Sequence, residues 1–212
     1  MAEEAGGHRP GAAAPHRGDA GHHLPDARPE FAALGFLAMR PVHGYDLHQL
    51  FEARLGKVWR LGQSQLYAVL KRLEAQGLVE AAVEEGRNSL ARKVFSTTTA
   101  GRVRLDAWLR EPSDCSARIL RLEFISRLFF ARELEPALLL PIVDSQEAEL
   151  RRHLATHRAL LATLAAGDAF NRLGMELKVR QLESLLAWFA ESVRPSSALG
   201  FPASSESDPQ AS

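Results

Sequence analysis

Residues 64–83 read SQLYAVLKRLEAQGLVEAAV, and two hydrophobic periodicities meet within this stretch. As far as Gly77 the apolar residues recur at the three- and four-residue spacing of an amphipathic helix, and beyond it every second residue is apolar, as in a half-buried strand. The first pattern predicts a helix from about Ser64 to Gln76, and the second predicts a strand directly after the glycine. The segments on either side then decide which fold these two elements belong to.

The predicted helix has an apolar face and, opposite it, a narrow basic face. Its core face consists of Leu66, Val69, Leu70 and Leu73. The opposite face consists of Ser64, Ala68, Lys71 and Ala75, with Tyr67 and Arg72 on its flanks and Gln65 beside Ser64 at its start. Small residues permit close approach to a DNA major groove, and Lys and Arg side chains reach phosphates or guanine edges. An ordinary surface helix fits the same pattern, and the helix alone does not separate the two interpretations.

A β-hairpin is predicted directly after this helix. Val79, Ala81 and Val83 lie at alternate positions, residues 85–89 have the composition of a turn, and residues 91–97 are rich in strand-forming types. The tip and the return strand carry the amide and basic side chains Arg87, Asn88, Arg92 and Lys93. Positive charge at these positions suits contact with phosphates or with a minor groove, although solubility alone would also account for it.

Two shorter helices are predicted ahead of residues 64–76. The first begins at Pro29, where the missing N–H costs nothing, and ends before Pro41. The second follows His43 and ends at Gly56, a residue type that helix C-termini favour. Three helices followed by a hairpin make a winged helix-turn-helix. Eight basic and four acidic residues lie between positions 54 and 93, in a chain whose formal net charge is zero. Positive charge is therefore concentrated where such a domain contacts DNA.

These segments resemble the PadR-like family of transcriptional regulators. The matching stretches are residues 34–38 (LGFLA), 41–47 (PVHGYDL), 65–74 (QLYAVLKRLE), 77–79 (GLV), 92–95 (RKVF) and 99–102 (TAGR). Together they cover about residues 31–112. Two positions depart from the family's pattern, because Ala68 stands where proline is frequent and Val94 stands where an aromatic residue is frequent.

The resemblance implies a homodimeric repressor that binds double-stranded DNA and is released by a small-molecule effector or a stress signal. It also implies that Tyr67 and Lys71 contact DNA backbone or base edges and that Lys93 lies on the wing. Tyr67 stands a quarter-turn from the core face, so packing inside the domain is its alternative. Trp108 falls on a predicted linking helix over residues 100–109. It either packs between domains or, as in some relatives, contacts the effector.

Beyond Pro112 the pattern is helical throughout, so we expect a winged helix domain over residues 29–112 and an all-helical domain over residues 113–194. Its helices are predicted at residues 114–132, 136–165 and 169–194, with Pro141 kinking the second or marking its true start. The last helix carries an apolar heptad seam: Met175, Val179, Leu182, Leu186, Phe189 and Val193. The seam can close a three-helix bundle. We expect it also to form a dimer, since two half-sites lie about 34 Å apart.

Composition excludes several other classes of protein. Residues 1–28 and 195–212 are poor in large apolar residues, so both tails are predicted to be disordered. Cys115 is the single cysteine, which suits a reducing compartment. Apolar runs fall well short of the roughly 20 residues that span a membrane, and the first residues do not resemble a signal peptide. The expectation is a cytoplasmic protein without a membrane segment.

Chemistry-bearing motifs are equally scarce. His153 and His157 share a helix face but lack further ligands and the glutamate of an HExxH motif, so no metal is expected. Cofactor fingerprints and nucleophile motifs are absent from the sequence, so we expect neither a cofactor nor an enzyme. A protein–protein interaction module is the alternative, because winged helices also dock proteins. A neutral or acidic recognition face would favour that alternative, whereas the face around Lys71 is basic.

Overall fold

The computed structural model describes residues 27–85, 91–165 and 167–198, so most of both predicted tails lies outside the described residues. The prediction of disorder is wrong where each tail joins the ordered part of the chain, at Arg28 and at residues 195–198. Arg28 is held in place, because its backbone N–H and its guanidinium both donate to the Glu123 carboxylate. At the other end, residues 195–198 continue a helix that starts at Arg194. Contacts with the helical half, which the local composition does not reveal, order both short segments.

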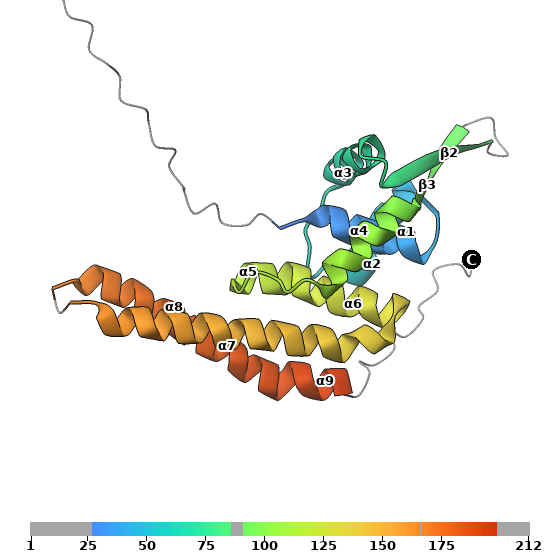
Figure 1. Ribbon diagram of the computed structural model, residues 1–212. Coiled ribbons are helices and arrows are strands. Elements are labelled where there is room, and N and C mark those ends of the chain that lie inside the picture. The colour runs from blue at the N-terminus through green and yellow to red at the C-terminus, as the bar shows by residue number, and fades with distance from the viewer. Residues whose placement is uncertain (1–26, 86–90, 166, 199–212) are drawn as a thin grey trace, which may run out of the picture.

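The described elements confirm a mainly α fold with a small β-sheet (Figure 1). The first half contains, in order, α1 (Pro29–Met39), β1 (Val42–His43), α2 (Gly44–Leu55), α3 (Gln63–Ala75), β2 (Val79–Glu85), β3 (Ala91–Thr97) and α4 (Thr99–Arg110). The second half contains α5 (Ala117–Ile119), a π-turn (Leu120–Phe124), α6 (Ile125–Leu134), a 3₁₀ turn (Pro136–Leu138), α7 (Leu139–Thr163), α8 (Ala169–Trp188), a second π-turn (Phe189–Val193) and α9 (Arg194–Ala198). The predicted helices all exist, with ends shifted by a few residues.

Helix α1 lies at the centre of the winged half rather than at its surface. The sequence predicts an apolar stripe on this helix, but every residue from Phe31 to Ala38 is buried. The reason is tertiary, because α2, α3, α4, β3 and α6 all contact α1. The eight residues of this run are all small or apolar, so they can be buried on all sides without leaving polar side chains unpaired.

The predicted hairpin gains a third strand. β2 and β3 pair antiparallel with Val79 opposite Thr97 and Val83 opposite Lys93, and β1 adds to the free edge of β3 with Val42 opposite Phe95. The sheet order is therefore β1-β3-β2. The alternation that predicted the strand holds only at its base, since Val79 is buried whereas Val83 is exposed. Beyond Ala81 the two strands leave the core and form the projecting wing seen in Figure 1.

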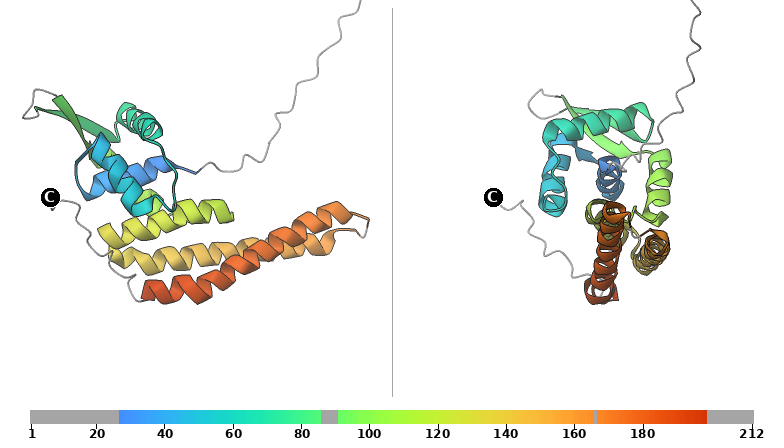
Figure 2. Two further views of the ribbon diagram at one scale, coloured as in Figure 1. Left: turned by 180° about the vertical axis from the view of Figure 1, so that it is seen from behind. Right: turned by 90° about the vertical axis from the view of Figure 1, so that its left-hand side faces the viewer.

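The helical half lies on the side of the winged half opposite α3. α6 packs against α1, while α7 and α8 pair antiparallel into a long hairpin that extends past α5 in the left view of Figure 2. Pro141 falls in the first turn of α7, so it marks the true start of that helix, as one reading of the sequence expects. Two hydrophobic clusters fill the molecule, one around Phe36 and one around Leu150, and Leu138 packs against both. In the chain, the loop with Pro112 lies between Leu109 of the first cluster and Cys115 of the second. The domain boundary at that loop stays a prediction.

A buried polar network joins the two halves. Glu123, which is almost fully buried, accepts hydrogen bonds from Arg28 and from the Trp108 indole N–H at 3.3 Å. The hydrogen bonds from Arg28 to this carboxylate raise the pKa of the Arg28 guanidinium. Arg127 lies fully buried over the Trp108 ring, 3.9 Å from the Glu123 carboxylate, and burial lowers its pKa to about 10. This network fixes the helical half beneath α1 and leaves the outer face of α3 uncovered (Figure 1).

Candidate nucleic-acid interface

The third helix is bounded by local interactions that its sequence encodes. At its start the Gln65 side-chain oxygen accepts a hydrogen bond from the Gly62 backbone N–H at 3.0 Å. At its end Gly77 adopts φ +67°, a left-handed conformation that glycine takes without strain, and the chain turns directly into β2. Within the helix Leu66, Val69, Leu70 and Leu73 are buried, as the periodicity predicts.

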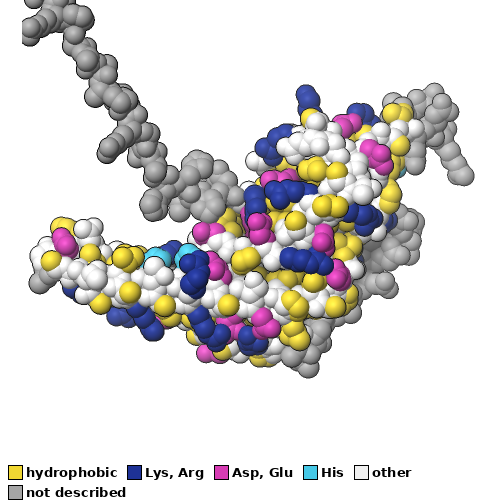
Figure 3. All heavy atoms as spheres, in the orientation of Figure 1, with side chains coloured by type: hydrophobic (Ala, Val, Ile, Leu, Met, Phe, Trp, Pro, Cys, Tyr) yellow, Lys and Arg dark blue, Asp and Glu magenta, His cyan; other side chains and the backbone are white. Residues whose placement is uncertain are grey.

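The predicted outer face of α3 is open to solvent. Its exposed members are Ser64, Gln65, Tyr67, Ala68, Lys71, Arg72 and Ala75. Figure 3 shows Lys and Arg side chains at the end of the molecule that carries α3. Lys71 and Arg72 have no carboxylate within ion-pair distance among the described residues. Their charge is therefore available to a partner.

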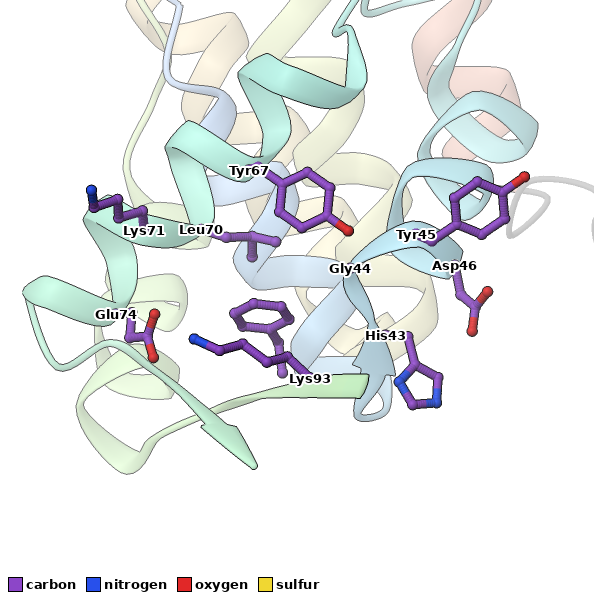
Figure 4. A pocket seen from close by; sticks show the side chains of 10 residues that line it. His43, Gly44, Tyr45, Asp46, Tyr67, Leu70, Lys71, Glu74 and Lys93 are labelled. Atoms are coloured by element: carbon purple, nitrogen blue, oxygen red, sulfur yellow. The ribbon is translucent and has the colours of Figure 1, made fainter. Parts of the chain in front are cut away.

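A groove of about 930 Å³ runs between α3, the first turn of α2 and strand β3 (Figure 4). Its lining residues are His43, Gly44, Tyr45, Asp46, Tyr67, Leu70, Lys71, Glu74, Lys93 and Phe95. Lys71 on the helix and Lys93 on the wing line the same groove although 22 positions separate them in the sequence. The structure thus brings Tyr67, Lys71 and Lys93 together. Asp46 and Glu74 also line this groove, so it carries acidic as well as basic side chains.

The Tyr67 ring lies on the wall of the groove and not inside the domain. Its side chain is 42% exposed, and the hydroxyl end of the ring lies over Gly44 at the start of α2. Figure 4 shows the ring reaching from α3 towards α2. Of the two positions that the sequence left open for Tyr67, the structure has the one on the surface. The hydroxyl is therefore placed where a ligand in the groove can meet it.

Sequence reasoning missed the contribution of α2 to this groove. Tyr45 is 55% exposed and lies beside Asp46 in the first turn of α2. Tyr45 and Tyr67 are the two tyrosines of the chain, and both line the groove. The available signal was the exposed aromatic residue within the stretch HGY at positions 43–45, directly before a helix. In the sequence this stretch indicated a helix start and contributed to the family resemblance, but Tyr45 was not among the predicted site residues.

The remaining wing residues are only partly described. Arg87 and Asn88 lie outside the described residues, and for Arg92 the structure describes the backbone in β3 but not the side chain. Lys93 is exposed and, within the described residues, has no ion-pair partner. A DNA contact for Arg87, Asn88 and Arg92 stays a prediction.

The apolar seam on the last helix faces the chain's own core, which corrects its expected use. Val179, Leu182, Phe189 and Val193 are buried within the single chain, while Met175 and Leu186 are partly buried. Contacts with α7 and with the helix that holds Phe124 occupy this face. Of the two uses considered for the seam, closing the bundle is the one that these contacts support. A dimer contact would have to use another face of α8.

Trp108 packs between the two halves. Its side chain is fully buried, its ring stacks on Phe31 with a centroid distance of 4.9 Å, and the Arg127 guanidinium lies over it. These contacts support the packing interpretation of this residue. Its role as an effector contact stays a prediction.

The described residues contain no cluster of three or more His, Cys, Asp or Glu arranged to hold a metal ion. His153 and His157 stack with ring centroids 6.1 Å apart, and their partners are Glu149 and the backbone carbonyl of His153. Cys115 is buried, and burial raises the pKa of its thiol to about 12. Among the described helices, none is both long and apolar enough to cross a membrane.

Three packed helices followed by a projecting antiparallel wing define a winged helix-turn-helix domain. Residues 33–107 match the family described as transcriptional regulator PadR-like, so this part of the chain is similar to the PadR-like regulators. The recognition made from the sequence is thereby confirmed. The matched residues include both lysine-bearing walls of the groove.

Individual relatives agree with this assignment. The chain is 31% identical over 80 residues to the negative transcriptional regulator PadR of Bacillus subtilis, covering 38% of this chain and 44% of that protein. It is 28% identical over 81 residues to the probable transcriptional regulator Rv1176c of Mycobacterium tuberculosis, covering 38% and 43%. The chain thus spans less than half the length of these relatives. A crystal structure of Bacillus subtilis PadR in complex with operator DNA aligns with a TM-score of 0.40 and 21% identity, covering 81% of this chain and 98% of that one.

Proposed function

We propose that this chain is a DNA-binding transcriptional regulator, acting as a homodimeric repressor of the PadR-like type. The observation that carries the proposal is the groove in which Lys71, Lys93 and Tyr67 meet on the side of the molecule that the helical half leaves uncovered. Exposed lysines without carboxylate partners attract phosphates, and the small residues of α3 allow the helix to enter a major groove. The regulatory names of the sequence relatives support the same function.

The recognition surface of the proposed complex consists of α3 and the wing. Ser64, Gln65 and Ala68 lie on the exposed first two turns of α3, the part of a recognition helix that meets base edges. Since the Gln65 oxygen is engaged with Gly62, its amide N–H₂ remains as the donor for a base. Lys71, Arg72 and Lys93 would then bind phosphates and supply most of the affinity.

Dimer formation is proposed through the outer face of the α7–α8 hairpin. Phe170, Leu173 and Leu177 follow helical spacing on α8 and are 90%, 62% and 59% exposed. We call these three residues the arm row. Exposing a row of apolar side chains to water costs free energy, and a second copy of the chain would cover this row. A dimer would supply the second α3 helix that an operator with two half-sites requires.

The proposal includes three further points that follow from the family and the expected site of action. The protein is not an enzyme, it works in the cytoplasm where the DNA lies, and a small molecule or stress signal releases it from DNA. Its working parts are a DNA-binding domain over residues 29–112 and a dimerisation domain over residues 113–194. None of the proposed steps requires a cofactor or a metal ion.

A salt titration of DNA binding tests the proposal. Labelled duplex from upstream of the chain's own coding sequence is mixed with the full chain, and binding is followed by gel shift at increasing salt. We expect affinity to fall steeply, with a log–log slope of about −0.9 for each phosphate bound. Lys71→Ala and Lys93→Ala should each weaken binding and reduce the slope by about one contact.

Arg118→Ala is the matched control, because Arg118 is an exposed cation on α5, away from the groove. It should leave both affinity and slope unchanged. A chain that binds the duplex without salt dependence, or equal behaviour of all three variants, would contradict the proposed interface. Binding to a protein partner instead of DNA would favour the interaction-module alternative.

A further inference from the structure

Gly44 is the first residue of α2, yet its backbone does not require glycine. Among the described glycines only Gly77 has a positive φ, so the conformation at Gly44 is one that alanine also adopts. Alanine is in addition the better helix former. The need for glycine at this position must therefore come from what lies against it.

The neighbour of Gly44 is the phenol of Tyr67. A Cβ atom at position 44 would lie 2.8 Å from Cε1, 2.9 Å from the hydroxyl oxygen and 3.0 Å from Cζ of Tyr67. Real Cβ contacts are longer than this, so a methyl group here would displace the ring. Figure 4 shows the Tyr67 ring lying over the start of α2, in the groove that Lys71 and Lys93 also line.

We propose that Gly44 is a positioning residue for DNA binding, because it seats the Tyr67 ring so that the hydroxyl meets the DNA backbone at the α2 side of the groove. The inference rests on the proposed function and deepens it by assigning a role to a residue of α2. A ring held in its bound orientation before binding loses less rotational freedom when the complex forms. A phenol hydroxyl so held donates one hydrogen bond to a phosphate oxygen.

A comparison with two other glycines shows why a side chain at Gly44 should affect DNA binding and not stability. A Cβ at Gly35 would meet the ring of Phe130, which is fully buried, and one at Gly101 would meet the Leu78 carbonyl oxygen. Neither neighbour can move without disturbing the core or the backbone. Tyr67, in contrast, is partly exposed, and its ring can swing into solvent at little cost. Gly44→Ala should therefore fold normally and bind DNA less well.

A double-mutant cycle on the full chain tests this inference. Binding of the labelled upstream duplex is measured by fluorescence anisotropy for the wild type, Gly44→Ala, Tyr67→Ala and the double variant. Losing one hydrogen bond should make Gly44→Ala bind about threefold to tenfold more weakly. The same substitution should have no further effect in the Tyr67→Ala background, since its only target is gone. Tyr67→Phe, which keeps the ring and lacks the hydroxyl, should match the loss seen for Gly44→Ala.

Gly167→Ala is the matched control, because a Cβ at this position, between α7 and α8, has no neighbour within 4 Å. It should bind as the wild type does. The inference is overturned if Gly44→Ala binds with wild-type affinity, if its loss persists unchanged with Tyr67→Ala, or if it unfolds at a lower urea concentration than the wild type. A wild-type chain that binds no duplex would instead overturn the proposed function itself.

Discussion

The winged face and the helical half use their cations in opposite ways. In the helical half and at its junction with α1, several arginines pair with carboxylates, as Arg28 does with Glu123, Arg158 with Glu183 and Arg194 with Glu147. On the winged face Lys71 and Lys93 have no such partner among the described residues. Both regions contain basic residues at similar density. The difference teaches that the position of the acids, more than the number of cations, separates a binding surface from a structural one.

The first way to break this comparison is to remove an acid on which the structural arginines depend. Glu123→Ala would leave Arg127 buried without a carboxylate and would also release Arg28. Stranding a buried charge typically costs about 3–5 kcal/mol, so we expect a loss of that size in the free energy of unfolding. Urea denaturation followed by circular dichroism measures it.

The control for Glu123→Ala is Glu183→Ala, which breaks the exposed pair with Arg158 on the α7–α8 hairpin. An exposed pair contributes about 0–1 kcal/mol, so this variant should unfold close to the wild type. If both substitutions have the same effect on the urea midpoint, the buried network does not hold the halves together.

The reactivity of Cys115 measures how well the core of the helical half excludes solvent. Its raised pKa of about 12, against an ordinary 9, means that the unfolded thiol ionises first as pH rises. The contribution of this group to stability is therefore full below pH 9 and is lost between pH 9 and 12. Near pH 9 the folded chain should hold about five hundredfold less thiolate than a free thiol.

Iodoacetamide labelling followed by mass spectrometry measures this difference. Labelling of the native chain should be slow at pH 9, and addition of urea should restore the rate of an ordinary cysteine. Rapid labelling of the native chain would show that the core around Cys115 opens readily.

On the winged face, reversing charge should affect binding and spare the fold. The double variant Lys71→Glu, Lys93→Glu replaces two phosphate-binding cations by anions on exposed positions. We expect DNA affinity to fall by about a hundredfold at low salt, with the urea midpoint unchanged. Arg118→Glu supplies the comparison at a position on α5. Retained binding by the double variant would remove the groove from the proposed interface.

The smallest expected effect concerns the arm row. Leu173→Ser with Leu177→Ser removes exposed apolar surface that a second copy would cover, and we expect the dimer to dissociate about tenfold more readily. Sedimentation velocity at several concentrations measures this change. Val103→Ser, an exposed apolar residue on α4, is the control and should leave the dimer intact. Unchanged association of the double variant would place the dimer contact elsewhere.

Local periodicity was sufficient for the elements that form the winged face. The change from helical to alternating spacing at Gly77 predicted α3, the hairpin and the outward orientation of Lys71, because each of these depends on residues within one or two turns. The same reasoning left Pro141 either a kink or a helix start, and the structure has the second. The exposed face of α3 was also predictable, since the exposed face of a helix is the complement of its periodic core face.

The sequence alone determined that this chain has a basic helix and a hairpin suited to a winged fold. Tertiary structure decided the rest: that β1 joins the sheet, that α1 is buried on every side, and that the seam around Leu182 closes the chain's own bundle. It also decided that Tyr67 rests on Gly44 and that Lys93 meets Lys71 in one groove. Each of these outcomes joins residues far apart in the chain. Spacing within a segment records which face is apolar, but it carries no information on what covers that face.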